Sequence, residues 1–338
     1  MFLLYPLVQF PLDTVLIHAD ARAIPLKDES VNCCVTSPPY WGLRDYGAAG
    51  QIGLEPTPEL YVATMVDVFR EVRRVLNADG TLWLNLGDSY CSVPGGGQQG
   101  KNGQMADRAV VRARAQVRDG KAAAGMGAPQ RPPSVEGLKP KDLVGIPWRV
   151  AFALQSDGWW LRSDIIWAKP NPMPESVTDR PTKSHEYLFL LAKSERYYYD
   201  ADAIAERSTH AGKVVTLGEK SLSRGQAAGA NVAASGNGTA SSVTVTETRN
   251  ARSVWTIPTT PYPGAHFATF PPALARRCIL AGCPPGGIVL DPFVGSGTTV
   301  MVARQLGREG IGVDINPKYL DEQAEKRIKT DRGFAFPA

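Results

Sequence analysis

The feature that most constrains the fold is a strand–turn–helix–strand unit near the carboxyl end of the sequence. An apolar run of strand length over residues 287–290 ends at Asp291, and a turn that holds Gly295 and Gly297 leads into a short helix. A second apolar run follows that helix and ends at Asp314. Two parallel strands joined by a helix in this way make half of a nucleotide-binding α/β fold. We therefore expect an α/β protein.

Further runs of strand length precede this unit and alternate with helices. Residues 57–76 predict one helix, because Thr57 can cap it and Pro58 suits its first turn. Its apolar stripe, which includes Tyr61, is expected to face the core. Buried strands that alternate with helices favour a mostly parallel sheet with helices on both faces. The strands are expected at residues 15–20, 31–36, 81–88, 163–167 and 187–191.

Two low-complexity segments interrupt this pattern. Residues 92–137 carry seven basic and three acidic side chains, an excess equal to the whole formal net charge of +4. We expect a mobile basic insertion there that could clamp phosphates, and a solvated insertion with no binding role is the alternative. Residues 221–246 are small and polar, and they are not expected to form a large core of their own.

Composition places the chain among globular proteins. Its 338 residues, 43% of them hydrophobic, are enough to bury one large core. The apolar opening, residues 1–8, is interrupted by Pro6 and reads as packing, and no stretch has the length of a membrane span. Five cysteines without zinc or redox spacing indicate reduced thiols in the cytoplasm and no metal site.

The turn after Asp291 has the features of a ligand-binding loop. Gly295 and Gly297 allow the backbone to approach a ligand closely, and the following helix offers free N–H groups to a carboxylate. Asp314 stands where an acidic side chain binds ribose hydroxyls in such folds. The loop lacks both the Gly-Lys-Ser/Thr of a phosphate-binding loop and the Gly-x-Gly-x-x-Gly of a dehydrogenase, which favours a nucleoside ligand without phosphates.

Ser37-Pro38-Pro39-Tyr40 directly follows the expected strand 31–36 and suits chemistry on the amino group of a base. That amine is a poor nucleophile because its lone pair is delocalised into the ring. Ser37 Oγ and the Pro38 carbonyl can both accept from it and hold it pyramidal, and the prolines fix the carbonyl direction. Tyr40 offers an aromatic face to a base swung out of a duplex, and direct displacement needs no covalent enzyme intermediate. A tight turn without chemistry is the alternative.

Both motifs resemble those of DNA amino-methyltransferases. Thr36-Ser37-Pro38-Pro39-Tyr40-Trp41 is similar to the catalytic loop of that family, and the stretch from Asp291 to Thr299 is similar to its S-adenosylmethionine loop. The resemblance covers most of the chain outside the low-complexity segments and implies a Rossmann-like, S-adenosylmethionine-dependent methyltransferase fold. The catalytic loop precedes the cofactor loop, as in the circularly permuted beta class. The implied cofactor-binding residues are Asp20, Asp291, Phe293, Gly295, Ser296, Gly297, Thr298 and Asp314, with Phe270 in a segment that closes over the methionine end.

The resemblance, which includes a phage and prophage branch of the family, also implies double-stranded DNA as the substrate. A small target-recognition region is expected at residues 202–255, between a catalytic half at 1–200 and a cofactor-binding half at 256–338. Arg249 and Arg252 of this region could contact phosphates or base edges. The candidates for the target-base pocket or the flipped strand, each as well explained by a structural role, are Trp41, Arg44, Lys169, Asn171, Arg180 and His185.

The identity of the base stays open at this point. Members with Asp at the first loop position mostly methylate adenine N6, whereas Ser, as at Ser37, leans toward cytosine N4, and we hold the two close to even. The alternatives in other classes are a catalytically silent DNA-binding protein of the same fold and a methyltransferase for RNA or a small molecule. A homodimer is in keeping with the class, while the target sequence and any partner restriction nuclease are not predicted.

Overall fold

The protein divides into two compact units, residues 1–198 with 254–338 and residues 199–253. The second unit nearly coincides with the expected target-recognition region. Residues 92–134 of the expected basic insertion lie outside the described residues. The computed structural model describes residues 8–9, 14–43, 45, 47–91, 135–209, 211–217, 232–234, 241–260 and 271–330.

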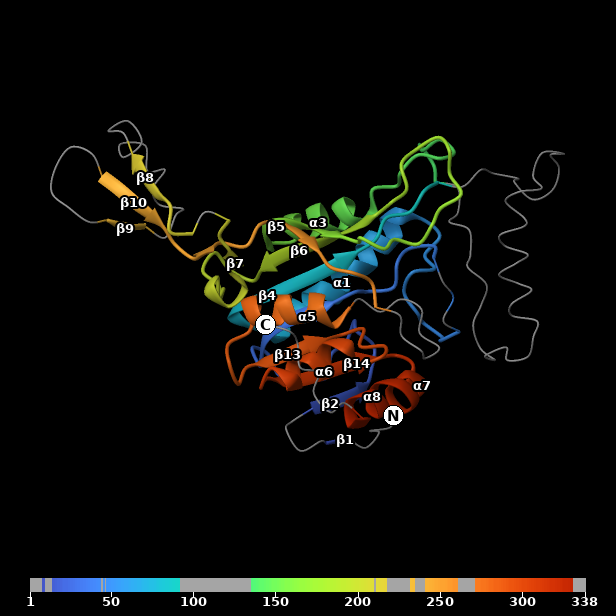
Figure 1. Cartoon of the computed structure of the whole chain (residues 1–338). Helices are drawn as coiled ribbons and strands as arrows, with labels where there is room; N and C mark the ends of the chain where they lie inside the picture. The colour runs from blue at the N-terminus through green and yellow to red at the C-terminus, as the bar shows by residue number, and fades with distance from the viewer. Residues whose placement is uncertain are drawn as a thin grey trace. The chain divides into compact units, whose positions relative to one another are not determined.

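The first unit is built on a sheet with the strand order β1-β2-β14-β13-β3-β4-β6-β5-β12 in its described part (Figure 1). The strands from β2 to β4 in that order are parallel, β6 is antiparallel to both β4 and β5, and β12 is parallel to β5. The expected mostly parallel sheet is confirmed, and each expected strand is present with ends that differ by a few residues. The strands are β1 (Val8–Gln9), β2 (Thr14–His18), β3 (Val31–Thr36), β4 (Leu76–Leu86), β5 (Trp160–Ala168), β6 (His185–Ala192), β12 (Val254–Thr256), β13 (Ile288–Asp291) and β14 (Glu309–Asp314).

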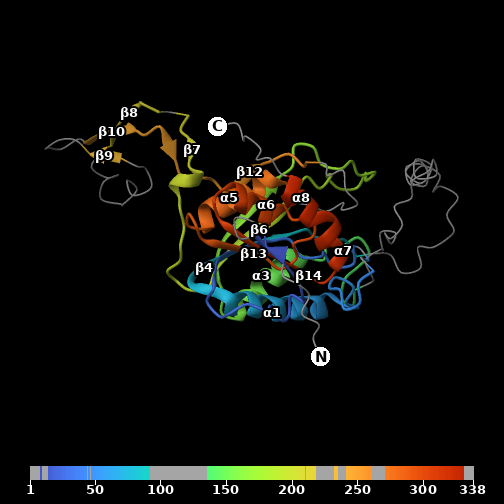
Figure 2. The ribbon, with the colours of Figure 1, turned by 90° about the horizontal axis from the view of Figure 1, so that it is seen from below.

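Helices cover both faces of this sheet. Figure 2 shows α1 and α3 on one side of it and α5, α6 and α8 on the other. Within the described residues, no helix has the length and apolar character needed to cross a membrane. The helices are α1 (Pro58–Val75), α3 (Ile146–Ser156), α5 (Pro272–Gly282), α6 (Thr298–Gln305), α7 (Pro317–Tyr319) and α8 (Glu325–Thr330), with a π-helical turn, η3, at Leu320–Ala324.

The sequence of α1 explains how it forms and where it packs. The Thr57 hydroxyl caps the helix by accepting a hydrogen bond from the Leu60 N–H at 3.3 Å. One face is buried, as the spacing predicts, and Tyr61, Met65 and Phe69 on it are 0% exposed. Each large apolar side chain buried in this way contributes roughly 1.5–3 kcal/mol. The helix is therefore fixed to the sheet mainly by this stripe.

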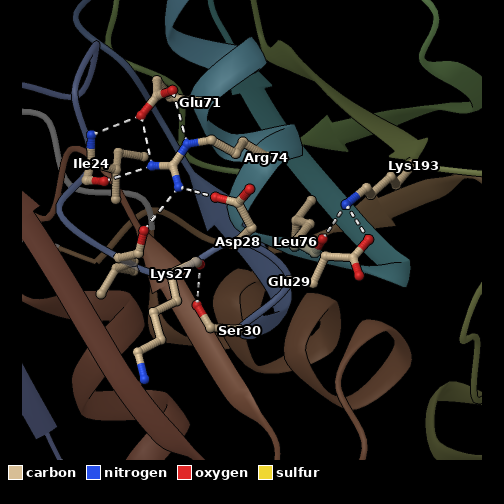
Figure 3. A network of polar contacts seen from close by, with 10 residues as sticks. Ile24, Lys27, Asp28, Glu29, Ser30, Glu71, Arg74, Leu76 and Lys193 are labelled. Atoms are coloured by element: carbon tan, nitrogen blue, oxygen red, sulfur yellow. Dashed lines mark hydrogen bonds and ion pairs between the residues drawn. The ribbon is translucent and has the colours of Figure 1, made fainter.

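Arg74, in the last turn of α1, forms hydrogen bonds beside the amino-terminal ends of β3 and β4. Its guanidinium donates to Asp28 Oδ1 at 2.6 Å, to the Ile24 carbonyl at 2.7 Å and to Glu71 Oε2 at 2.9 Å (Figure 3). Asp28 and Ile24 precede β3 in sequence, whereas Arg74 and Glu71 precede β4. The network therefore joins the starts of two neighbouring strands, away from their carboxyl ends.

The second unit is small and built mainly from antiparallel strands. β7 (Glu206–Arg207) pairs with β11 (Thr248–Arg249), and a short 3-10 helix, η1 (Asp202–Ile204), precedes β7. The low-complexity segment 221–246 contributes strands, because two of the three strands of the other sheet lie in it. These strands are β8 (Val214–Leu217), β9 (Val232–Ala234) and β10 (Ser241–Val245).

The strand order brings the two sequence motifs to one edge. β13 lies between β3 and β14, and all three strands are parallel. Ser37 follows the carboxyl end of β3, the turn after Asp291 follows β13, and Asp314 ends β14. Because the carboxyl ends of adjacent parallel strands meet at the same edge, segments far apart in sequence lie together there.

Candidate active site

One cleft at this edge is lined by both motifs. Its empty space, counting the open mouth, is about 1030 Å³. The wall includes most of the residues predicted from the sequence, namely Asp20, Ser37, Pro38, Pro39, Tyr40, Asp291, Phe293, Gly295, Ser296, Thr298 and Asp314. It also includes residues that the sequence did not single out, among them Ala21, Leu43, Gln51, Ile52, Val294, Ile315, Asn316 and Tyr319.

Asp291, the last residue of β13, links the two loops and is 2% exposed. Its carboxylate accepts hydrogen bonds from the Thr36 and Thr299 hydroxyls, both at 2.7 Å, and from the Phe293 N–H at 3.1 Å. Burial raises the pKa of Asp291 to about 6, against the effect of these hydrogen bonds. Because Thr36 directly precedes Ser37, this carboxylate holds the catalytic loop and the cofactor loop in one arrangement.

Asp314 performs a similar function at the end of β14. Its two carboxylate oxygens accept from the Gly295 N–H at 3.0 Å and from the Asn316 N–H at 2.8 Å. Burial raises the pKa of Asp314 to about 6, and the charge of Asp291 acts in the same direction. Each oxygen keeps a further lone pair. The residue predicted to bind ribose hydroxyls therefore also fixes the backbone of the cofactor loop.

Arg327 of α8 holds the middle of the cofactor loop, a contact that the sequence did not predict. Its Nη1 donates to Ser296 Oγ at 2.9 Å and to Thr298 Oγ1 at 2.8 Å, and these two residues are 2% and 4% exposed. Gly297 between them has φ 78°, and a Cβ there would lie 3.1 Å from Ala324. The residues that line the cleft do not include Gly297, so we interpret it as a conformational rather than a contacting residue.

The catalytic loop is fixed from α1 by Tyr61. The Tyr61 hydroxyl donates to the Pro39 carbonyl at 2.8 Å, although helical spacing predicted only a core residue. Among the described residues, none donates a hydrogen bond to the carbonyl of Pro38, which lines the cleft. Gly87 lies against the catalytic ring, because a Cβ added there would be 2.5 Å from Cε2 of Tyr40. The loop is therefore held in place while one of its carbonyls stays available.

The Tyr40 hydroxyl lies among three polar side chains. Its oxygen is 2.7 Å from Glu186 Oε2, 3.1 Å from Asn85 Oδ1 and 3.4 Å from Ser37 Oγ. Burial and the Glu186 carboxylate raise the pKa of Tyr40 well above its usual value. The hydroxyl therefore stays protonated, and the ring lines the cleft from a fixed position.

Two candidates for contact with the target base are occupied elsewhere. Lys169 forms an ion pair with Glu186, and its ammonium lies 4.3 Å from the ring centre of Trp167. With 17% of its side chain exposed, Lys169 supports Glu186, and its contact with the target base stays a prediction. Trp41 is 1% exposed, and its indole N–H donates to the Glu55 carbonyl at 2.9 Å. The expected contact of Trp41 with the target base is therefore contradicted, because the turn after Tyr40 directs this ring into the core.

Two further candidates anchor the loop between β5 and β6. The Asn171 amide bonds twice to the backbone of Thr259, at 2.9 and 3.2 Å. Arg180 pairs with Glu175 at 2.7 Å, and its guanidinium lies 4.1 Å from the ring centre of Tyr90. Both side chains already have partners within the protein, so contact with a flipped strand stays a prediction.

His185 and Asp20, the remaining described candidates of the first unit, lie at different places in the fold. His185 begins β6, and its ring lies edge-on to Tyr187 with centroids 5.4 Å apart. Asp20 lines the cleft and pairs with Arg22 at 2.5 Å, and the guanidinium outweighs burial to keep the pKa of Asp20 below its usual value. No cluster of three metal-ligating side chains occurs in the described part of the chain. The candidates that fall outside the described residues are Arg44 and Phe270.

Arg249 and Arg252 share one carboxylate in the second unit. Glu206 accepts from Arg252 Nε at 2.9 Å and pairs with Arg249 at 3.4 Å. Arg252 is 69% exposed and Arg249 is 35% exposed at the side chain. The two guanidiniums therefore share Glu206, and contact of either one with DNA stays a prediction.

The chain is similar to a protein-family model and to known proteins. The family model N6_N4_Mtase, described as DNA methylase, matches residues 31–326. Type II methyltransferase M.SmaI from Serratia marcescens is 47% identical over 93% of this chain and 90% of its own length. Type II methyltransferase M.Cfr9I from Citrobacter freundii is 47% identical over 90% of this chain and 85% of its own.

Solved structures share the fold at lower identity. The PvuII DNA methyltransferase (cytosine-N4-specific) has a TM-score of 0.59 at 16% identity, over 98% of this chain and 92% of its own. TTHA0409 from Thermus thermophilus, complexed with S-adenosyl-L-methionine, has a TM-score of 0.54 at 23% identity, over 94% of this chain and 95% of its own. The expected α/β methyltransferase fold is confirmed.

Proposed function

The chain belongs to the N6_N4_Mtase family of DNA methylases, and we propose that it methylates N4 of cytosine in double-stranded DNA. Membership makes it a site-specific, S-adenosylmethionine-dependent DNA amino-methyltransferase. The observation that carries the proposed site is the single cleft lined by Ser37, Tyr40 and the loop after Asp291. Ser37 at the first position of the catalytic loop supports cytosine N4, with adenine N6 as the alternative.

The wall of the cleft fits S-adenosylmethionine. The Asp314 carboxylate keeps lone pairs beyond its two backbone donors, which suits ribose hydroxyls. Ile315 and Tyr319 supply apolar surface for a purine ring, and Gly295 lines the wall without a side chain. Phe293 would face the methionine end. When bound, the cofactor supplies an electrophilic methyl group on a positively charged sulfur.

The catalytic loop supplies the acceptors that the target amine needs. Ser37 Oγ and the Pro38 carbonyl would both accept from the amine, which relocalises its lone pair. Tyr40 would stack on the flipped base, with its hydroxyl held in the protein. Methylation at carbon 5 of cytosine would need a reactive thiolate, and all five cysteines are buried. The geometry therefore favours direct transfer to the amine.

The second unit would read the target sequence. The exposed Arg252 guanidinium, beside Arg249, supports contacts with DNA there. The position of β2 beside β14, with the catalytic loop early in the chain, supports the permuted beta-class arrangement. Residues 1–200 and 256–338 would then be the catalytic and cofactor-binding halves of one domain.

The cellular setting belongs to the same proposal. The Type II names of the relatives support a restriction–modification context. A partner nuclease would then cleave the unmethylated target sites and leave the methylated sites of the cell intact. Five buried free cysteines support the cytoplasm. Assembly as a homodimer is in keeping with the class and would be measured by sedimentation.

Nucleoside analysis tests the proposed base directly. The protein is incubated with isotope-labelled S-adenosylmethionine and unmethylated genomic DNA, and the digested nucleosides are identified by mass spectrometry. Label on N4-methyldeoxycytidine is the expected result. Label on N6-methyldeoxyadenosine would reject cytosine and retain the mechanism, whereas label only on RNA added in parallel would reject DNA as the substrate.

A further inference from the structure

We propose that Glu186 is a positioning residue that fixes the direction of the hydrogen bond between Ser37 and Tyr40. The Ser37 oxygen is thereby presented to the target base as an acceptor only. This inference rests on the proposed role of Ser37 as an acceptor for the target amine, and it adds a reason why the site takes an amine at all. Glu186 acts through Tyr40 and does not itself line the cleft.

The first step concerns the single proton of the Tyr40 hydroxyl. Two acceptors face it, Glu186 Oε2 at 2.7 Å and Asn85 Oδ1 at 3.1 Å. The orientation of the Asn85 amide is set, because its Nδ2 donates to the Tyr187 carbonyl at 3.1 Å and its oxygen therefore points to Tyr40. The nearer and charged acceptor takes the proton. The Tyr40 oxygen consequently has only lone pairs to offer elsewhere.

The second step concerns the charge of Glu186. Its other oxygen pairs with the Lys169 ammonium, and the two side chains are 16% and 17% exposed. A carboxylate held by an ammonium has no proton to donate. Lys169, itself held over the Trp167 ring, therefore keeps Glu186 an acceptor and keeps the Tyr40 proton directed away from Ser37.

The third step concerns Ser37. Its Oγ is 3.4 Å from the Tyr40 oxygen, and catalytic hydrogen bonds that are long without substrate commonly tighten when substrate binds. Because the Tyr40 oxygen can only accept here, the Ser37 proton goes to it. The Ser37 lone pairs remain for the cleft. An exocyclic amine can donate to them, whereas the exocyclic oxygen of thymine or guanine cannot, so this bond direction selects amino bases over oxo bases.

Glu186→Gln is the variant that releases the bond direction with little change of shape. Lys169 needs an oxygen, so the amide oxygen stays with Lys169 and the NH₂ group faces Tyr40. The NH₂ donates to the Tyr40 oxygen, whose own proton then goes to Asn85 Oδ1 or to Ser37 Oγ. The direction of the bond between Ser37 and Tyr40 is then no longer fixed. We expect kcat for methyl transfer to DNA to fall at least about 10-fold, which corresponds to the loss of about 1.4 kcal/mol of transition-state stabilisation. The Kd of S-adenosylmethionine is expected to stay unchanged.

A double-mutant cycle distinguishes this action from a general structural one. Tyr40→Phe keeps the ring and removes the hydroxyl, so it is expected to lower kcat by a similar factor. Adding Glu186→Gln to Tyr40→Phe should then lower kcat no further. Additive losses in the cycle, or wild-type kcat in either single variant, would overturn the inference. Tyr40→Phe alone keeps the test decisive if Glu186→Gln fails to fold.

Two further variants separate the inference from the proposed function. Ser37→Ala should lower kcat at least about 100-fold, and full activity would reject the acceptor role of Ser37 itself. Loss of activity in Ser37→Ala with normal activity in Glu186→Gln would reject only the inference. Glu71→Gln is the matched control, because Glu71 is a partly exposed carboxylate paired with Arg74 at the opposite edge of the sheet. It should lower thermal stability and leave kcat unchanged.

Discussion

At the scale of single residues, one added methyl group at position 87 is expected to displace the catalytic ring. A Cβ on Gly87 would lie 2.5 Å from Cε2 and 2.9 Å from Cδ2 of Tyr40. Since a shift of about 1 Å in a reacting group can cost about 100-fold in rate, Gly87→Ala should lower kcat by about that factor. Steady-state methyl transfer measures this, and calorimetric binding of S-adenosylmethionine should stay normal. Wild-type kcat would mean that the position of the ring is not critical.

The carboxylate of Asp314 predicts how cofactor binding depends on pH. Burial raises the pKa of Asp314 to about 6, so the group becomes protonated as the pH falls through that value. The protonated form accepts hydrogen bonds from ribose less strongly, and the Kd of S-adenosylmethionine should rise roughly tenfold between about pH 7 and pH 5. Asp314→Asn should bind S-adenosylmethionine weakly, and its Kd should depend less on pH. Some pH dependence should remain, because burial also raises the pKa of Asp291 to about 6 and this group still titrates. A flat wild-type profile would contradict this assignment.

Individual side chains also show where sequence reasoning succeeded and failed. Ser37 and Asp291 could be predicted because short motifs carry their chemistry. Trp41 could not, since an aromatic residue beside a catalytic motif suggests a stacking role until the turn shows its ring 1% exposed. Lys169 was a candidate from the family resemblance, which does not reveal its partner, because Glu186 is brought beside it only by the pairing of β5 with β6.

At the scale of elements, α8 is expected to control cofactor affinity without touching the cleft. Arg327 donates to the buried Ser296 and Thr298 hydroxyls, so Arg327→Met leaves both without their donor. We expect the Kd of S-adenosylmethionine to rise about 10-fold or more. Lys329→Met on the same helix removes an ion pair whose Lys329 side chain is 56% exposed, and it serves as the control, since such pairs contribute little. Equal effects of the two variants would assign the loss to the helix as a whole.

Elements were predictable where their signals are local. The cap and the apolar spacing of α1 are signals between residues that are close in sequence, and so are those of the βαβ unit from β13 to β14. Both elements are present as expected. The contacts that align them, such as Tyr61 to Pro39 and Arg327 to Ser296, join separate elements. No spacing rule reveals such pairs, because they depend on which helix lies over which strand.

At the scale of the whole molecule, the charge distribution predicts the salt dependence of DNA binding. Residues 92–137 hold the excess of basic charge, while the rest of the chain is balanced. Changing the basic residues of this segment to Gln should weaken DNA binding and reduce the slope of log K against log salt by about 0.9 for each phosphate that the protein no longer neutralises. Filter binding at several salt concentrations measures the slope. An unchanged slope would reduce the segment to a spacer.

The place of β13 and β14 in the sheet has a consequence for the synthesis of the protein. These two strands lie between β2 and β3, yet they are the last two strands of the described chain to leave the ribosome. A nascent chain that already carries the catalytic loop therefore has a gap in its sheet and only one wall of its cleft. Pairings between distant parts of a chain form slowly. A nascent chain thus cannot methylate DNA until the ribosome has synthesised β13 and β14, which carry the second wall of the cleft.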